Sequence, residues 1–230
     1  MSQITSRRRT RRQLPRIGPD SAGRFMTTAE FDALEPKQLV GHNRYELIHG
    51  VLIVSPIPGL LERDPNEELG YWLRLYRDTH PRGSVLDLTV HEQTLFATTN
   101  RRRADRAIWT GLGRAPDEKH DVPSILVEFV SPRRRDALRD YEAKRDEYLA
   151  AGVQEYWVVD RFLRRLTVFR PSSGGPAVTI VPEGQDYETP LLPGFILPLE
   201  RLLNRVDRLV KASRGHQTRG QGPSDGGANG

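Results

Sequence analysis

The sequence predicts an α/β fold, and three observations indicate it. Residues 125–130 (ILVEFV) form a short apolar run, rich in β-branched side chains, that ends at Ser131-Pro132. A run of this length and composition is typical of a strand buried on both faces. A helical stretch follows at 136–151, and further strand-like runs come at 155–160 and 165–170. Strands and helices in this order favour a sheet covered by helices.

The elements before this region fit the same class. Residues 27–34 predict a short amphipathic helix capped by Thr27 or Thr28. Residues 45–54 predict a hairpin, because two apolar runs flank His49-Gly50 and glycine supplies the positive φ of a tight turn. A helix is expected at 65–79, with Pro65 near its N-terminus. Its apolar face consists of Leu69, Trp72, Leu73 and Tyr76.

The remaining elements continue the pattern. Residues 84–98 are strand-like, and 104–109 (ADRAIW) predict a strand with a carboxylate near its start. A loop then leads to the strand at 125–130. The helix at 136–151 ends at Gly152. A short turn joins the strands at 155–160 and 165–170, and an amphipathic helix within 197–213 comes last.

Composition separates a folded part from two tails. The chain has 230 residues and a net charge of +5, of which residues 1–24 carry +6 and residues 211–230 carry +2. Residues 25–210 therefore carry a net charge of −3, so bulk charge does not make the folded part a nucleic-acid binder. We expect a disordered basic arm at 1–24, one domain at 25–211 and a disordered tail at 212–230. The arm could contact phosphates, it could be a solvated tail, or Met26 could be the true start.

The chain contains no cysteine, which excludes disulfides and thiolate metal sites and suits a cytoplasmic location. No apolar stretch is long enough to span a bilayer, so we expect no membrane association. The basic N-terminus is not followed by the hydrophobic run of a secretory signal.

Glu128 is the most informative residue, because it lies in the middle of the apolar run. A buried carboxylate is costly to ionise unless a cation pairs with it. A metal ion is one candidate partner, and a buried arginine is the alternative. Asp105 precedes it in a strand-like setting, and Lys144 follows beside the apolar stripe of a helix. Two carboxylates and a lysine on adjacent elements can form a metal-dependent site that cleaves phosphodiesters.

This order of residues resembles the Uma-two family of restriction endonucleases, in the PD-(D/E)XK nuclease superfamily. The resemblance covers roughly residues 26–200. It rests on MTTAEFDAL (26–34), RYELIHGVLIVSP (44–56), ADRAIW (104–109), ILVEFVSP (125–132), DYEAKRDEYLAAGVQEYWVVD (140–160) and LTVFR (166–170). It implies a restriction-endonuclease-like mixed sheet flanked by helices. It also implies metal ligands at Asp105 and Glu128, a catalytic lysine at Lys144 and an accessory carboxylate at Glu46.

The chain departs from the family pattern at two places. The family has Pro-Asp where this chain has Ala104-Asp105-Arg106, and position 130 is valine where the superfamily motif has lysine. In the family the lysine lies on the following helix in a Lys-Arg pair, here Lys144-Arg145. A helical wheel places these two on opposite sides of the inward stripe, so geometry leaves the choice between them open. A surface lysine whose truncation costs little packing is the alternative for Lys144.

Alternatives also exist for the other carboxylates. Asp105 could be a strand-end residue in a surface ladder with the neighbouring arginines, and Glu46 could be an exposed residue of the hairpin. The sequence as a whole predicts a Mg²⁺- or Mn²⁺-dependent DNA endonuclease, with RNA as a possible substrate and a homodimer as a plausible assembly. The alternative is a catalytically inactive module on the same fold that binds nucleic acid or a partner.

Overall fold

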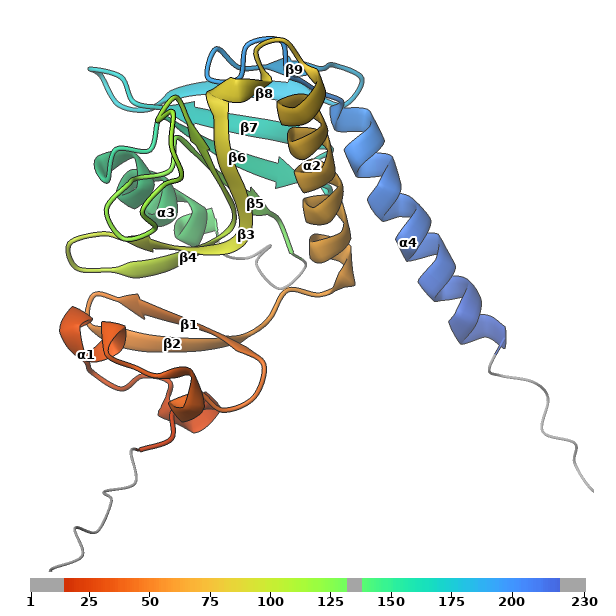
Figure 1. The fold of residues 1–230 in the computed structure, drawn as a ribbon. Coiled ribbons are helices and arrows are strands. Elements are labelled where there is room, and N and C mark those ends of the chain that lie inside the picture. The colour runs from red at the N-terminus through yellow and green to blue at the C-terminus, as the bar shows by residue number, and fades with distance from the viewer. Residues whose placement is uncertain (1–14, 132–137, 220–230) are drawn as a thin grey trace, which may run out of the picture. The chain divides into compact units, whose positions relative to one another are not determined.

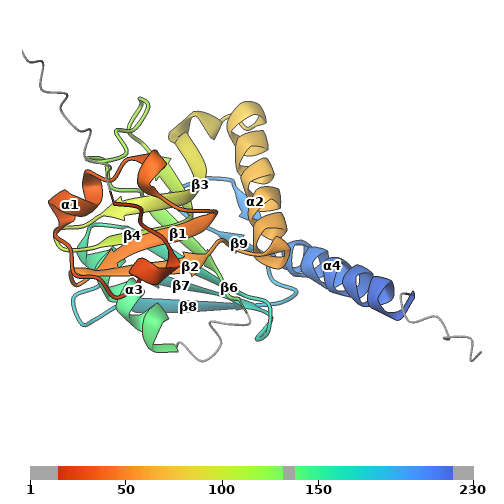
Figure 2. The same cartoon turned by 90° about the horizontal axis from the view of Figure 1, so that it is seen from below.

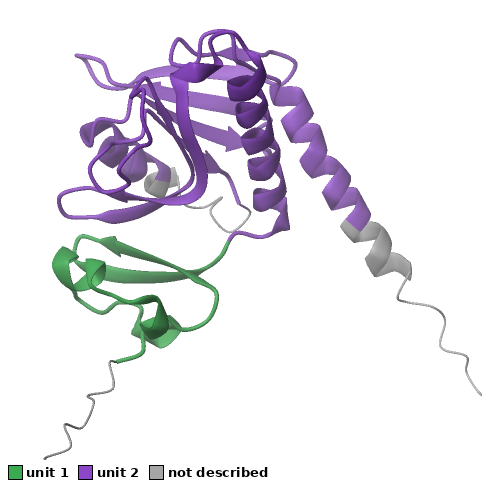
Figure 3. Cartoon of the chain, in the orientation of Figure 1, with its two compact units in different colours: residues 1–57 green, residues 58–230 purple. Residues whose placement is uncertain are grey.

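The computed structural model describes residues 15–131 and 138–219. The chain forms two compact units, which divide between Ile57 and Pro58 (Figure 3). The predicted α/β class is confirmed. Within the residues that the structure describes, no helix is both long and apolar enough to cross a membrane.

The first unit is built around the predicted hairpin. Strands β1 (Asn43–Ile48) and β2 (Val51–Pro56) pair in antiparallel register, and both turn residues, His49 and Gly50, have positive φ, as a tight hairpin turn requires. Helix α1 (Thr28–Asp32) is capped by the Thr27 side chain, which accepts the N–H of Glu30. Two 3₁₀ turns, η1 (Pro19–Ser21) and η2 (Pro36–Gln38), complete the unit.

The predicted boundary of the N-terminal arm is wrong for residues 15–24. Ile17 is buried in a small core with Tyr45 and Leu52, and it forms a bridge with Leu39. The Tyr45 hydroxyl donates to the Ile17 carbonyl at 3.0 Å. Pro, Gly and Arg dominate this segment and suggested disorder, but Ile17 packs on the hairpin, and backbone hydrogen bonds join Gly23 and Arg24 to Leu52. Residues 1–14 of the predicted arm lie outside the described range.

The second unit contains a mixed sheet with the strand order β3-β4-β5-β6-β7-β8. Strands β5 and β6 are parallel to each other, and the other neighbouring pairs are antiparallel. The strands are β3 (Leu86–Phe96), β4 (Arg101–Thr110), β5 (Ile125–Phe129), β6 (Glu155–Asp160), β7 (Arg165–Arg170) and β8 (Ala177–Pro182). The parallel pair arises because helix α3 (Leu138–Ala150) connects β5 to β6.

Helices cover both faces of this sheet, as the resemblance implied. Helices α2 (Leu60–Thr79) and α4 (Leu199–Arg219) lie on one face, and α3 lies on the other (Figures 1 and 2). Each face has its own apolar core. Ile125, Val127 and Phe129 of β5 belong to the core under α2 and α4, whereas Leu126 belongs to the core under α3. The continuous apolar run of β5 follows from burial on both faces.

Several boundaries differ from the predictions. Helix α2 begins at Leu60, so Pro65 lies inside it and not at its start. Helix α4 extends to Arg219, beyond the predicted tail boundary, and residues 220–230 lie outside the described range. Strand β8 and the short pair β9 (Tyr187–Glu188) and β10 (Ile196–Leu197) were not predicted. Residues 136 and 137 of the predicted helix also lie outside the described range.

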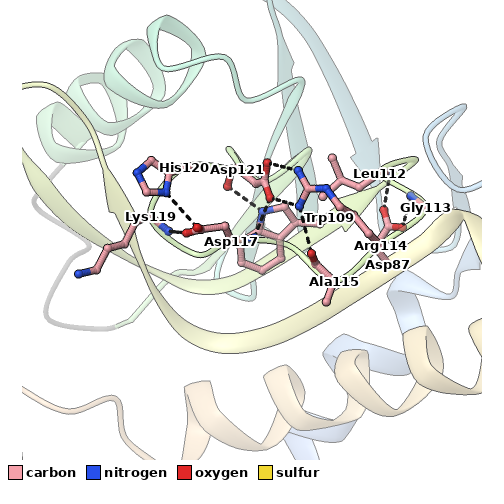
Figure 4. Close-up of polar contacts among 10 residues, drawn as sticks. All are labelled: Asp87, Trp109, Leu112, Gly113, Arg114, Ala115, Asp117, Lys119, His120 and Asp121. Atoms are coloured by element: carbon pink, nitrogen blue, oxygen red, sulfur yellow. Dashed lines mark hydrogen bonds and ion pairs between the residues drawn. The ribbon is translucent and has the colours of Figure 1, made fainter.

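The loop between β4 and β5 is held by its own polar side chains (Figure 4). Asp121 accepts two hydrogen bonds from the Arg114 guanidinium, at 2.5 and 2.8 Å, and one from the Asp117 N–H at 2.7 Å. Asp87 of β3 accepts the N–H groups of two loop residues, Leu112 and Gly113, at 2.8 Å each. These contacts fix the connection between the two strands that carry Asp105 and Glu128.

Candidate functional site

Glu128 lies on β5 with a solvent exposure of 0%. Side chains alternate along a strand, and Leu126 and Val130 on either side of Glu128 both pack in the core beneath α3. The Glu128 carboxylate therefore points to the α3 face. An ionised carboxylate in that position needs a partner inside the protein.

Lys144 of α3 supplies this partner. Its Nζ donates to Glu128 Oε1 at 2.8 Å, and the lysine side chain is only 1% exposed. The Tyr148 hydroxyl, one helical turn further on, donates to the same oxygen at 3.3 Å. Glu128 therefore has a lysine as a partner, and the alternative of a surface position for Lys144 is wrong.

Asp105 on β4 lies beside Glu128. The register of β4 with β5 pairs Ala107 with Leu126 and ends at Arg106 with Val127, so Asp105 and Glu128 are the residues that come directly after the last pair. Residues opposite each other in an antiparallel pair point to the same face. Asp105 Oδ2 accepts the backbone N–H of Phe129 at 2.8 Å. Asp105 is buried, which excludes the surface ladder considered from the sequence.

Arg106 points away from this carboxylate pair, to the opposite face of the sheet. Its Nε and one terminal nitrogen donate to the side-chain oxygen and the carbonyl of Asn66 on α2, at 2.7 and 2.8 Å, and Thr89 accepts from the other terminal nitrogen at 3.0 Å. Burial lowers the pKa of Arg106 to about 10. Asn66 also donates to the Asp105 carbonyl at 2.7 Å, so one amide holds both residues.

Lys144 and Arg145 have different surroundings in the structure. Arg145 is partly exposed, donates to its neighbour Asp146 at 2.8 Å and lies over the ring of Phe169, 5.6 Å from the ring centre. Lys144 alone of the two faces Glu128. Tyr141 is partly buried and packs against the core beneath α3.

Glu46 lies on β1 of the first unit, opposite Ile53 of β2. It is buried, so the alternative of an exposed hairpin residue is wrong. Because it belongs to the other unit, we do not count it with the group formed by Asp105, Glu128 and Lys144. Its accessory role stays a prediction.

The donor set of the second unit suits one kind of metal ion. In residues 15–131 and 138–219, no three or more His, Cys, Asp or Glu side chains are grouped so that they could hold a metal. Asp105 and Glu128 form a pair of hard oxygen donors, and no nitrogen or sulfur ligand accompanies them. Mg²⁺ keeps several waters and is commonly bound through one or two carboxylates, so this pair fits Mg²⁺ or Mn²⁺ better than zinc.

Some residues of the site were missed at the level of sequence. Tyr148 was not chosen as a site residue, although its hydroxyl reaches Glu128. Asn66 is separated from Asp105 by 39 positions and from Arg106 by 40, so no local pattern connects them. The spacing of Lys144 and Tyr148, four residues apart, could have indicated that both face the same strand.

Comparisons with known proteins give the family of this chain and a similar fold. A model of the Uma2 (Uma-two) family, described as "Putative restriction endonuclease", matches residues 28–200. No curated protein matches the chain. Among solved structures, the chain is similar to a putative nuclease belonging to DUF820 from Anabaena variabilis ATCC 29413, with 15% identity and a TM-score of 0.63, over 77% of this chain and 99% of that one. A second similar structure is the type IIG restriction endonuclease BpuSI, with 13% identity and a TM-score of 0.36, over 69% of this chain and 18% of that one.

Proposed function

We propose that this chain, which belongs to the Uma2 family, is a metal-dependent DNA endonuclease. The model of that family matches residues 28–200. The solved Anabaena variabilis protein, described as "a putative nuclease", has a similar fold. Fold alone does not establish activity, so the proposal depends on the site.

One observation carries the proposal. Asp105 and Glu128 lie on two neighbouring strands, where Asp105 accepts the N–H of the residue after Glu128, and the Lys144 ammonium reaches Glu128 at 2.8 Å. Each of these side chains is at most 4% exposed. A structural core would be as stable with apolar residues here, because buried ion pairs often add no net stability. Two hard oxygen donors beside a positioned cation suit phosphoryl chemistry instead.

The three residues have separate roles in this proposal. Asp105 and Glu128 would hold Mg²⁺ or Mn²⁺, and the ion would act as a Lewis acid on a phosphate oxygen. The Lys144 ammonium stabilises the negative charge that develops on the phosphate in the transition state. The Phe129 N–H keeps the Asp105 carboxylate oriented, and Tyr148 does the same for Glu128.

The proposed substrate is DNA, with RNA as the alternative to test. Asp105 and Glu128 are two buried carboxylates, so a bound cation is needed before this site can accept a phosphate. Cleavage of both strands of a duplex requires two sites, which favours a homodimer.

A plasmid cleavage assay tests the proposal. Wild-type protein should convert supercoiled plasmid to nicked and linear forms in millimolar Mg²⁺ or Mn²⁺, and EDTA should stop the reaction. Asp105→Asn and Glu128→Gln keep the shape of the side chains and should each reduce the rate at least about a hundredfold, the order seen when transition-state charge stabilisation is removed. Asp64→Asn is the control, since Asp64 lies on α2 and pairs with Arg205 of α4.

Thermal melts separate the proposal from an inactive binding module. Metal that binds the native state should raise the melting temperature of wild type but not of Glu128→Gln. A metal-dependent rise without cleavage of DNA or RNA would support the inactive module. The absence of both cleavage and any response to metal would contradict a metal site at Asp105 and Glu128.

A further inference from the structure

The rotation of α3 about its own axis decides which cation faces Glu128. Lys144 and Arg145 are adjacent, so their side chains point about 100° apart around the helix. A turn of the helix by that angle would exchange one for the other. Something in the structure must therefore fix the rotation.

Few apolar side chains of α3 are buried, so apolar packing contributes little to fixing the rotation of this helix. Among residues 141–150, only Lys144 and Tyr148 are buried. The two buried side chains of this stretch are thus a lysine and a tyrosine, and both make polar contacts to Glu128, with Tyr141 packed partly buried beside them. An ordinary amphipathic helix would present a stripe of aliphatic side chains here.

A bidentate ion pair lies one turn along from Lys144. Arg102 of β4 donates to Glu147 of α3 through Nε and a terminal nitrogen, at 2.9 Å to each carboxylate oxygen. The Arg102 side chain is 5% exposed and that of Glu147 is 18% exposed. Two parallel hydrogen bonds fix orientation as well as distance, so this pair cannot survive a large rotation of the helix.

The spacing connects the ion pair to the site. Glu147 follows Lys144 by three positions, and residues three and four apart lie on the same side of a helix. The strand that carries Arg102 also carries Asp105, three residues later. The Arg102–Glu147 ion pair thus joins the helix that carries Lys144 to the strand that carries Asp105.

We propose that Arg102 and Glu147 are a positioning pair, which fixes the rotation of α3 so that Lys144, and not Arg145, faces Glu128. Their bidentate contact, beside a helix face with few apolar residues, carries this inference. It deepens the proposed function, because it explains how that site selects its cation. Neither residue needs to touch the substrate.

Lysine modification tests the proposal without relying on cleavage. The chain has four lysines, and Lys37, Lys119 and Lys211 are exposed whereas Lys144 is buried. Brief acetylation followed by mass spectrometry should therefore modify those three and spare Lys144. They serve as internal controls in every variant.

The main variant replaces both partners, Arg102→Gln together with Glu147→Gln, so that no buried charge is left unpaired. The Lys144 acetylation rate should rise about tenfold, within the coupling range of residues in one ion-pair network. In cleavage assays kcat should fall while KM changes little, because positioning acts on the transition state. The exchanged pair, Arg102→Glu with Glu147→Arg, should restore both protection and kcat in part.

A matched control uses another bidentate pair between elements. Arg205 of α4 donates to Asp64 of α2 at 2.6 and 2.9 Å, on the opposite face of the sheet. Arg205→Gln with Asp64→Asn should leave Lys144 protected. If the Arg102/Glu147 glutamine variant melts like wild type and also keeps Lys144 protected, the positioning role is refuted. If Lys144 becomes reactive in that variant but wild type cleaves nothing, the proposed function fails and the positioning pair stands.

Discussion

Lys144→Met should be one of the most damaging single changes in this chain. Methionine has nearly the length of lysine, so little packing is lost, but Glu128, at 0% exposure, then loses its hydrogen bond from the Lys144 ammonium. Removal of one partner from a buried ion pair typically costs about 3–5 kcal/mol. The Tyr148 hydroxyl still donates to Glu128, which places the expected cost near the lower end, at about 3 kcal/mol.

The double variant Lys144→Met/Glu128→Gln should be more stable than Lys144→Met. It lacks both members of the ion pair, and Tyr148 can still bond to the amide oxygen. We expect its free energy of unfolding to lie within about 1–2 kcal/mol of wild type, because replacement of a whole buried pair is often close to neutral. The two changes are therefore non-additive, as expected for residues in direct contact.

Urea unfolding in EDTA measures these values, with tryptophan fluorescence as the probe, because Trp72, Trp109 and Trp157 are all buried. Arg145→Met is the control and should cost no more than about 1 kcal/mol, since it loses only an exposed ion pair and a contact with the Phe169 ring. A loss below about 1 kcal/mol for Lys144→Met, or a double variant as unstable as the sum of the single changes, would refute this account of the buried pair.

Three further changes test other parts of the structure. Ile17→Ala should cost about 2–4 kcal/mol in urea unfolding, because Ile17 is buried, whereas a loose arm would give no change. Gly70→Ala should lower the melting temperature, since its Cβ would lie 2.5 Å from the guanidinium of Arg106, and an unchanged melt would contradict the buried position of that arginine. The Arg114 hydrogen bond and the Asp117 N–H lower the pKa of Asp121 from 3.8 to about 2, so this carboxylate stabilises the fold above pH 3.8 and loses that effect as the pH falls through about 2. The difference in melting temperature between wild type and Asp121→Asn should therefore shrink from pH 5 towards pH 2. A difference in melting temperature that is independent of pH would count against the Asp121 contacts.

The sequence predicted much of the fold because its signals were local. The hairpin at His49-Gly50 and the buried strand around Glu128 each follow from a few neighbouring residues. The N-terminal boundary failed for the opposite reason, since the docking of Ile17 depends on Tyr45 and Leu52, which are distant in sequence. The predicted start of helix α2 was wrong, because proline is common in the first turn of a helix whereas Pro65 lies inside this one.

The candidate site was predictable to the level of residue types but not of contacts. Asp105 and Glu128 were chosen because carboxylates in apolar strands need a cation, and both are buried side by side. The rotation of α3 could not be derived, because Lys144 and Arg145 flank the apolar stripe equally. The alternation between neighbouring strand residues did offer an unused signal, because it places Arg106 on the face opposite to that of Asp105.

A buried lysine that could be replaced without loss of stability requires a reason other than stability. If Lys144→Met/Glu128→Gln folds almost as well as wild type, the ion pair is not retained for the fold. The same double variant should lack cleavage entirely, since it has neither the proposed metal ligand nor the proposed cation. Stability and cleavage measured on this one protein therefore separate the two explanations. A stable, inactive double variant supports a catalytic pair, whereas a double variant that is stable and still cleaves would place the catalytic centre elsewhere in the chain.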